Sequence, residues 1–331
     1  MTLTIGSLFS GYGGLDLAVE QVLDAEPIWF CEWDDAPSRV LAHHWPHVPN
    51  YRDVTTVDWE QVPRVDILTG GTPCQDLSNA GKRAGMTEGT RSNLWVSMRE
   101  AIAILKPRLV VWENVLGALS ASATSDSDME PGAGLLGEGG GGHLRALGRV
   151  LGDLTEVGYD AAWTTVRASD VGAPHHRARI FLIAIPSDSH DERRPDDLCG
   201  GHGTEVTAVA GRGRTLPDSE DNRPERYGEP REGWVGLTGG HNRTVEWGDY
   251  APAVRRWERL TRPAPNPTEL NRNGNPRLNS EFASWMMGLP AGHVTSVPGL
   301  SRADQIRMIG NGVCPQQGAA ALRQLIEAVN G

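Results

Sequence analysis

The chain has 331 residues and a formal net charge of −11, with 39% hydrophobic and 22% charged residues. These proportions are typical of a globular protein with a sizeable core, and at roughly 100–200 residues per domain the length predicts about two domains. No apolar run reaches the roughly eighteen residues of a membrane span, and we expect no signal peptide. The four cysteines are widely spaced, which favours a reduced cytoplasmic protein without disulfides.

Short apolar runs alternate with helical patterns through the first half of the chain, which is typical of an α/β sheet. Strands are predicted over residues 3–9, 28–31, 65–69, 109–112, 161–166 and 178–185. Helices are predicted after a glycine turn at residues 10–14, and over residues 94–105, 144–157 and 317–329. Residues 117–142 contain eight glycines and few large apolar side chains, so we expect a flexible surface insertion there.

The composition changes after residue 185. Residues 186–275 contain 12 glycines, 9 prolines and 13 arginines with poor periodicity, which predicts a second, loop-rich domain. Most of the negative charge lies in residues 1–185, which hold 14 basic and 23 acidic residues, against 13 and 16 in residues 186–275. Because local fields decide binding, the negative total does not exclude a nucleic-acid partner.

The glycine turn Phe9-Ser10-Gly11-Tyr12-Gly13-Gly14 lies between a predicted strand and helix. Such a turn lets a ligand approach the helix N-terminus, although tight turns of this kind are common. It lacks the GxGxxG spacing of dinucleotide sites, which favours a nucleoside without a pyrophosphate. Glu32 could bind ribose hydroxyls and Trp33 could stack on a purine or simply pack. Asp53 could accept from an amino group or cap a helix.

The segment GGTPCQDLS at residues 70–78 follows the third predicted strand. A cysteine at this edge of the sheet, near helix N-termini, is placed to react as a thiolate. Lone cysteines are more often small buried hydrophobic residues, but Pro-Cys-Gln between glycines and polar residues is a poor core segment. We therefore interpret Cys74 as a nucleophile.

Glu113 ends a further strand beside apolar residues, where a carboxyl group can hold a raised pKa and donate a proton or can cap the next helix. Arg177 and Arg179 are two apart on a predicted strand and can face one pocket, unless they form a solvated basic edge. His175 and His176 lack partners at ligand spacing, and we expect no metal site.

Together these motifs resemble those of the cytosine carbon-5 DNA methyltransferases. The resemblance covers residues 1–185 and about 276–331. It rests on LFSGYGGLD (8–16), CEWDD (31–35), RDV (52–54), GGTPCQDLS (70–78), WENV (112–115), PHHRARIF (174–181), RLNSEFASWMMGLP (277–290) and IGNGV (309–313). The chain departs from the family in having His175 where glutamine is usual, and in its long 117–142 insertion.

The resemblance implies a doubly wound, mostly parallel sheet of the S-adenosylmethionine-dependent methyltransferase fold. Residues 1–185 would form the catalytic and cofactor-binding domain, and residues 186–275 a smaller loop-rich target-recognition domain. Residues 276–331 would form a hinge and a C-terminal helix that returns to the catalytic domain.

The family mechanism implies that Cys74 attacks C6 of a flipped cytosine and Glu113 acts at N3. It also implies that Arg179 binds the ring O2 and that Arg177 supports the loop or the phosphate. The positions implied for S-adenosyl-L-methionine, and for its product S-adenosyl-L-homocysteine, are Phe9, Gly11, Gly13, Glu32, Trp33, Asp53, Val54, Pro73, Leu94, Asn311 and Val313. The implied DNA contacts are Gln75, Ser78, Lys82 and Arg83.

We expect a monomer, encoded by a prokaryote or a phage, that acts on double-stranded DNA and does not associate with membranes. Three alternatives are weighed against this: an RNA cytosine methyltransferase, a catalytically silent DNA-binding protein, and a nucleotide-level enzyme similar to thymidylate synthase. The sequence leaves open the recognised DNA site and whether a cognate restriction endonuclease accompanies the protein.

Overall fold

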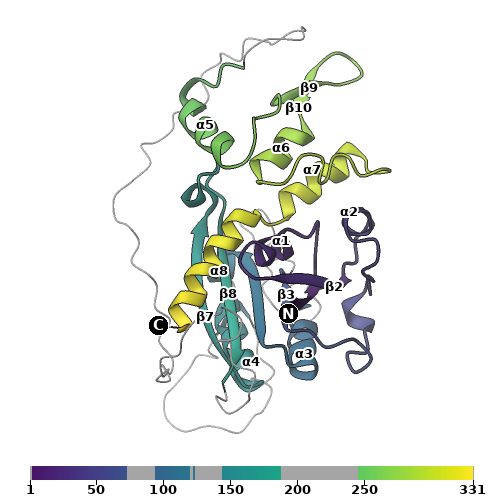
Figure 1. Cartoon of the computed structure of the whole chain (residues 1–331), viewed down its shortest axis with the longest axis vertical. Coiled ribbons are helices and arrows are strands. Elements are labelled where there is room, and N and C mark those ends of the chain that lie inside the picture. The colour runs from purple at the N-terminus through teal and green to yellow at the C-terminus, as the bar shows by residue number, and fades with distance from the viewer. Residues whose placement is uncertain (1, 73–93, 120–121, 124–143, 188–244, 331) are drawn as a thin grey trace.

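The computed structural model describes residues 2–72, 94–119, 122–123, 144–187 and 245–330 (Figure 1). Most of the predicted 117–142 insertion and most of the predicted 186–275 domain lie outside these ranges. Within the described ranges, no helix is both long and apolar enough to cross a bilayer.

The central sheet has six strands in the order β2-β1-β3-β4-β8-β7. They are β1 (Leu3–Leu8), β2 (Ala25–Cys31), β3 (Ile67–Gly70), β4 (Leu109–Val115), β7 (Tyr159–Arg167) and β8 (Ala178–Pro186). Neighbouring strands are parallel except where β8 pairs with β4 and β7. The predicted α/β, doubly wound and mostly parallel fold is therefore confirmed. A separate two-stranded pair joins β5 (Ser122–Ala123) to β6 (Leu144–Arg145).

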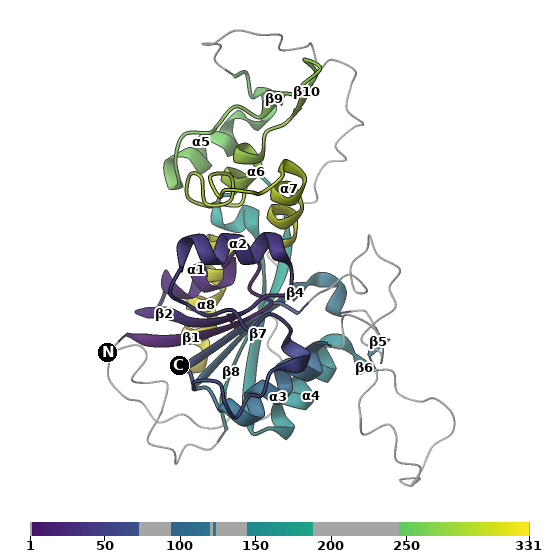
Figure 2. The same ribbon diagram turned by 90° about the vertical axis from the view of Figure 1, so that its right-hand side faces the viewer.

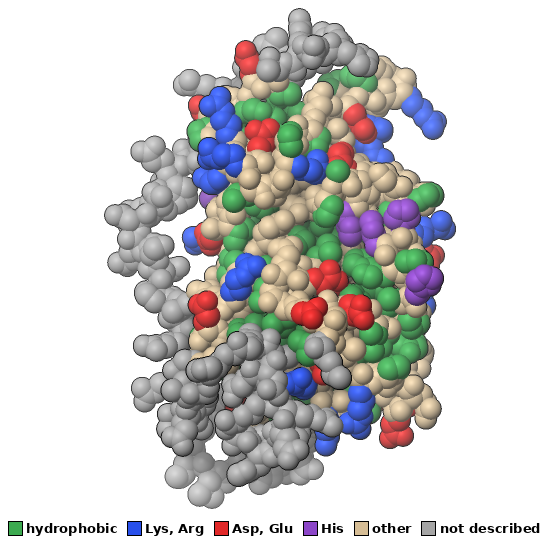
Figure 3. Space-filling view, in the orientation of Figure 1, with side chains coloured by type: hydrophobic (Ala, Val, Ile, Leu, Met, Phe, Trp, Pro, Cys, Tyr) green, Lys and Arg blue, Asp and Glu red, His purple; other side chains and the backbone are tan. Residues whose placement is uncertain are grey.

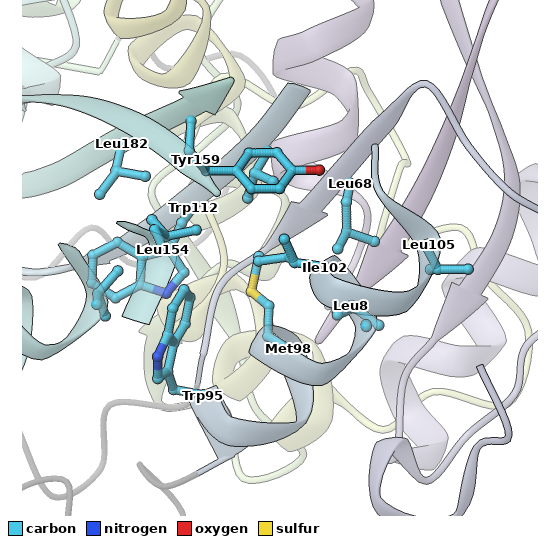
Figure 4. Packing of buried hydrophobic residues seen from close by; sticks show 14 of the residues in the cluster. Leu8, Leu68, Trp95, Met98, Ile102, Leu105, Trp112, Leu154, Tyr159 and Leu182 are labelled. Atoms are coloured by element: carbon cyan, nitrogen blue, oxygen red, sulfur yellow. The ribbon is translucent and has the colours of Figure 1, made fainter. Parts of the chain in front are cut away.

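Helices cover both faces of the sheet (Figure 2). On one face lie α1 (Gly14–Glu20) and α8 (Pro315–Asn330), and on the other α3 (Trp95–Leu105) and α4 (Ala146–Glu156). Because side chains alternate across a strand, Leu68, Val110 and Trp112 pack under α3 and α4 (Figure 4). Ile67 and Val111 face α1 and α8 instead. A further helix, α2 (Asp35–His44), follows β2.

The strand order reverses at β1, because β2 lies on one side of it and β3 on the other. In open α/β sheets, ligands bind at the carboxyl ends of the strands beside such a switch point. The glycine turn after β1 lies at this place. Short 3₁₀ helices complete this part of the chain: η1 (Val54–Thr56), η3 (Leu116–Leu119) and η5 (Ala168–Val171).

Residues 245–311 pack together beyond one end of the sheet (Figures 1 and 2). They form η7 (Gly248–Tyr250), α5 (Ala251–Leu260), β9 (Thr268–Leu270), β10 (Pro276–Leu278), α6 (Ser280–Met286) and α7 (Arg302–Asn311). The buried Trp257 indole donates to the carbonyl of Trp285, whose own indole donates to the carbonyl of Arg262, at 2.8 and 2.9 Å. The β9–β10 hairpin joins residues on both sides of the predicted boundary at 275/276.

Two local expectations differ from the structure. Gly-Asn-Gly at residues 310–312 has the composition of a turn, but α7 continues through Asn311, and the backbone leaves helical geometry only at Gly312 before α8. Arg177 was expected on a strand, but β8 begins at Ala178. The φ angle of Arg177 is 27°, which interrupts the extended backbone, so Arg177 and Arg179 do not share one strand face.

Candidate active site

The loop after β1 coils tightly, with φ angles of 53° at Phe9, 55° at Gly11 and 83° at Gly13. At Gly11 and Gly13 the missing side chain allows this left-handed conformation without strain. Among the described residues, a Cβ atom at Gly11 would meet nothing within 4 Å, so the loop has open space beside it at the start of α1. A ligand can therefore approach backbone N–H groups at a helix N-terminus here.

Glu32, at the end of β2, holds this loop in place. One carboxylate oxygen accepts from the Gly11 N–H and the other from the Asp34 N–H, both at 2.8 Å. Burial raises the pKa of Glu32, and the two N–H donors oppose that rise. Each oxygen keeps lone pairs for further donors such as ribose hydroxyls. The neighbouring Trp33 side chain is 69% exposed, which leaves its ring free to stack on a ligand.

The other positions expected near a cofactor have differing surroundings. Asp53 caps η1, because its Oδ1 accepts from the backbone N–H and hydroxyl of Thr55 at 3.0 and 2.7 Å. This cap is the structural role that the sequence left open beside ligand binding. Val54, the first residue of η1, is buried, and Leu94 is half-buried immediately before α3. Pro73 lies outside the described residues.

Residues 309–313 lie against the glycine turn, although the two segments are some 300 residues apart in sequence. The Tyr12 hydroxyl donates to the Val313 carbonyl at 2.7 Å. The Arg177 guanidinium donates to the carbonyls of Gly310 and Gly312, at 2.9 and 2.5 Å. Asn311 between them is exposed. Arg177 thus fixes the backbone of a segment expected to hold the cofactor.

Glu113 and Arg179 form an ion pair on neighbouring strands, with 3.0 Å between Arg179 Nε and a Glu113 carboxylate oxygen. The Glu113 side chain on β4 is almost fully buried, and burial raises its pKa against the opposing effect of Arg179 and Arg177. Burial thus favours the protonated form of this carboxyl group, the form that can donate a proton, whereas the ion pair with Arg179 favours the carboxylate.

The segment that leads to Cys74 is anchored beside this pair. Trp112 Nε1 and Asn114 Nδ2, which flank Glu113 on β4, both donate to Thr72 Oγ1 at 3.0 Å. A Cβ atom at Gly71 would lie 3.3 Å from a Glu113 carboxylate oxygen. The chain is therefore fixed against Glu113 up to the second residue before Cys74.

Cys74 itself lies outside the described residues, as do Gln75, Ser78, Lys82 and Arg83. Two other cysteines are described, and both are buried. Burial raises the pKa of the Cys31 thiol to about 12 and that of Cys314 to about 11, which disfavours the reactive thiolate.

Two neighbours of the site carried no clear signal in the sequence. Tyr12 is a large residue in a turn that otherwise consists of small residues and Phe9. Nothing else in the sequence indicates its contact with residues 309–313. His175 bonds through Nε2 to the Met286 carbonyl at 2.9 Å, which joins the segment before β8 to α6. Its partner is more than a hundred residues away, so no local pattern could reveal the contact.

The model of the C-5 cytosine-specific DNA methylase family matches residues 3–327. The chain belongs to this family. Among curated relatives, the DNA N-6-adenine-methyltransferase of Escherichia phage P1 is 32% identical over 214 residues, which are 55% of this chain and 28% of the relative. The type II methyltransferase M.NgoBV of Neisseria gonorrhoeae is 32% identical over 180 residues, covering 53% of this chain and 39% of that protein. The chain thus spans less than half of each of these relatives.

Solved structures of methyltransferases share the fold. The S. pombe Dnmt2 methyltransferase superposes with a TM-score of 0.58 at 14% identity, covering 99% of this chain and 100% of that one. The putative DNA modification methyltransferase of an E. coli prophage has a TM-score of 0.53 at 19% identity, with 98% and 99% coverage.

Proposed function

We propose that this protein is a DNA (cytosine-5-)-methyltransferase that transfers a methyl group from S-adenosylmethionine to C5 of a cytosine in a specific duplex site. Family membership supports the reaction class. The observation that supports the proposal is the fixed approach of residues 71–72 to the Glu113–Arg179 pair, because a chain held there would bring Cys74, two residues after Thr72, near a buried acid.

The open side of the glycine turn fits the nucleoside part of S-adenosylmethionine. Its adenine would stack on Trp33, its ribose would donate to Glu32, and backbone groups at Phe9, Gly11 and Gly13 would surround its amino-acid part. Asp53, Val54, Pro73, Leu94, Asn311 and Val313 would complete the site. When bound, the cofactor supplies an electrophilic methyl group on a sulfonium, and S-adenosylhomocysteine is left.

The reacting cytosine needs activation, because its C5 atom is a weak nucleophile. The Cys74 thiolate would form a bond to C6 and push the ring electrons toward N3, where Glu113 would supply a proton so that negative charge does not accumulate. Arg179 would hold the ring O2 and keep Glu113 oriented. After methylation, the C5 proton would leave, and the electrons of its bond would re-form the double bond between C5 and C6. This would break the bond between sulfur and C6 and release the Cys74 thiolate.

A paired cytosine cannot reach these groups, so it would rotate out of the duplex at a cost of about a few kcal/mol. Gln75, Ser78, Lys82 and Arg83 would contact the DNA as the loop from residue 75 onward closes. Residues 186–275 would read base edges in the major groove, where each bidentate arginine–guanine contact contributes about 1–3 kcal/mol of discrimination.

Charge supports a DNA partner on the side of residues 245–311. This part of the chain has eight arginines and six acidic residues, whereas residues 2–72 have three arginines and eleven acidic residues. The negatively charged DNA phosphates would be attracted to residues 245–311 and repelled by residues 2–72. Relatives named type II methyltransferases support a place in restriction–modification, in which a cognate endonuclease would be a genetic partner. The methyltransferase itself would act as a monomer.

Glu113→Gln tests the proposal. The amide keeps the shape but supplies no acidic proton, so we expect kcat for tritium transfer from S-adenosylmethionine to duplex DNA to fall about a hundredfold or more. Binding of S-adenosylhomocysteine should stay unchanged. Glu156→Gln is the control, because Glu156 pairs with Arg99 at 2.8 Å on the surface of α4 and should be silent.

Nucleoside mass spectrometry of the product identifies the methylated base. The proposal predicts 5-methylcytosine from duplex DNA. It fails if the wild-type protein makes N6-methyladenine, as the name of the phage P1 relative would suggest, or if it methylates tRNA and leaves DNA unmodified. It also fails if Glu113→Gln retains full activity.

A further inference from the structure

Tyr12 is a large buried side chain inside the glycine turn. Only 1% of it is exposed, and its hydroxyl donates to the Val313 carbonyl at 2.7 Å. Its ring lies between two glycines, because a Cβ atom would come within 2.7 Å of the ring at Gly14 and within 2.0 Å at Gly312. The ring therefore fills the space between the turn at residues 9–14 and the segment at residues 309–313.

The backbone of Tyr12 is held by His293, which in turn packs on a second histidine, His44. The Tyr12 carbonyl accepts from His293 Nε2 at 2.9 Å, and the two rings meet edge to face with centroids 6.1 Å apart. His293 stacks on His44 at 4.1 Å, and His44 Nε2 donates to the His293 carbonyl at 2.8 Å.

The protonation state of His293 fits its hydrogen bond to the Tyr12 carbonyl. Burial lowers the pKa of His293 to about 4, so its ring is neutral at pH 7. In the neutral ring, the hydrogen bond to a carbonyl requires the proton on Nε2. Tyr12 is thus fixed at its hydroxyl by the C-terminal segment and at its backbone by the loop between α6 and α7.

We propose that Tyr12 is a positioning residue that sets the distance between the two cofactor-binding segments, and so the affinity for S-adenosylmethionine. This inference rests on the proposed function. Tyr12 acts through its neighbours, since it is buried and its hydroxyl is already paired. Without the hydroxyl, the buried Val313 carbonyl loses its donor and the two segments are free to separate.

Tyr12→Phe tests the inference against Tyr159→Phe. Tyr159 is a close match, since it is 3% exposed and its hydroxyl donates to the Pro107 carbonyl at 2.7 Å in the core beneath α3 and α4. We expect both variants to lose similar thermal stability. In calorimetric titration with S-adenosylhomocysteine, Tyr12→Phe should bind about tenfold more weakly than wild type, and Tyr159→Phe should bind as wild type does.

Equal affinity in the two variants would overturn the positioning role and leave the proposed function intact. Wild-type protein that binds no S-adenosylhomocysteine would overturn both. A second pair of variants covers the case in which Tyr12→Phe does not fold. His293→Leu removes the donor to the Tyr12 carbonyl and should weaken binding several-fold, whereas His293→Gln keeps a side-chain nitrogen near Nε2 and should restore it. Equal binding by these two variants would also contradict the inference.

Discussion

The Asp16 carboxyl group lies fully buried where α1 meets the sheet. It accepts from the Ser7 hydroxyl on β1 at 2.8 Å and from the Thr69 hydroxyl on β3 at 2.6 Å. Burial raises the pKa of Asp16 to about 6, although both hydroxyl donors oppose the rise. The two contacts join the helix that follows the glycine turn to the two strands at the switch point.

Because the pKa of Asp16 is higher in the folded than in the unfolded chain, its protonated form favours folding. This stability is complete below about pH 4 and is lost as the pH rises through about 6. Asp16→Asn mimics the protonated group, since an amide can accept from one hydroxyl and donate to the other. We expect it to raise the free energy of unfolding at pH 7.5, by at most about 2–3 kcal/mol, with little gain at pH 4.

Urea unfolding at the two pH values measures this effect. Glu100→Gln, an exposed change on α3, should alter stability at neither pH. If Asp16→Asn is less stable than wild type at pH 7.5, the ionised carboxylate is the form that the fold requires, and this prediction is wrong.

Several candidate site residues could be placed individually from the sequence because each lies in or directly after a recognisable apolar strand. Glu32, Glu113 and Arg179 lie where the apolar runs and their motifs place them. Tyr12 and Arg177 could not be interpreted in this way. Their partners lie beyond residue 300, and the left-handed backbone at Arg177 depends on contacts that no local pattern contains.

At the scale of elements, α8 packs closely against α1 beside the site. A Cβ atom at Gly318 would lie 2.7 Å from the Cβ of Ala18 and 3.5 Å from the Phe181 ring. Glycine therefore lets the C-terminal helix approach the helix that begins at the glycine turn.

Gly318→Ala should push α8 away from α1 and lower the free energy of unfolding by about 1–3 kcal/mol. Gly152→Ala is the matched control, because Gly152 is also inside a helix, α4, and among the described residues nothing lies within 4 Å of its Cβ position. It should stabilise by about 0.5–1 kcal/mol, since alanine favours helix more than glycine does. Chemical denaturation compares them, and equal effects of the two substitutions would refute the packing argument.

The elements themselves were largely predictable, because apolar runs marked the six strands of the central sheet and helical periodicity marked α1, α3, α4 and α8, whereas α2 was not predicted. The first and last residues of these elements were harder to predict. The sequence Gly-Asn-Gly at residues 310–312 has the composition of a turn, yet α7 continues to Asn311, where the Arg177 guanidinium holds the carbonyls on either side. The doubly wound, mostly parallel arrangement of the sheet was implied by the resemblance to a family and not by any single run of residues, and the order of the strands was not predicted.

For the whole molecule, the separation of charge along the chain matters more than its total of −11. Arginines are concentrated in residues 245–311, while Figure 3 shows a group of acidic side chains near the middle of one face. The proposed duplex would lie between the end of the sheet that carries Glu113 and the part formed by residues 245–311. The base that is rotated out would then face the segment anchored by Thr72.

The central claim is that Cys74 bonds transiently to C6 of a cytosine in duplex DNA. A duplex with 5-fluorocytosine at the target tests it directly, because fluorine at C5 cannot leave as a proton does and the adduct is trapped after methylation. We predict a denaturant-resistant complex of wild-type protein and DNA, with the modified peptide containing Cys74, and no complex from Cys74→Ala. A wild-type protein that methylates ordinary duplex but forms no adduct, or an adduct that persists in Cys74→Ala, would contradict the account.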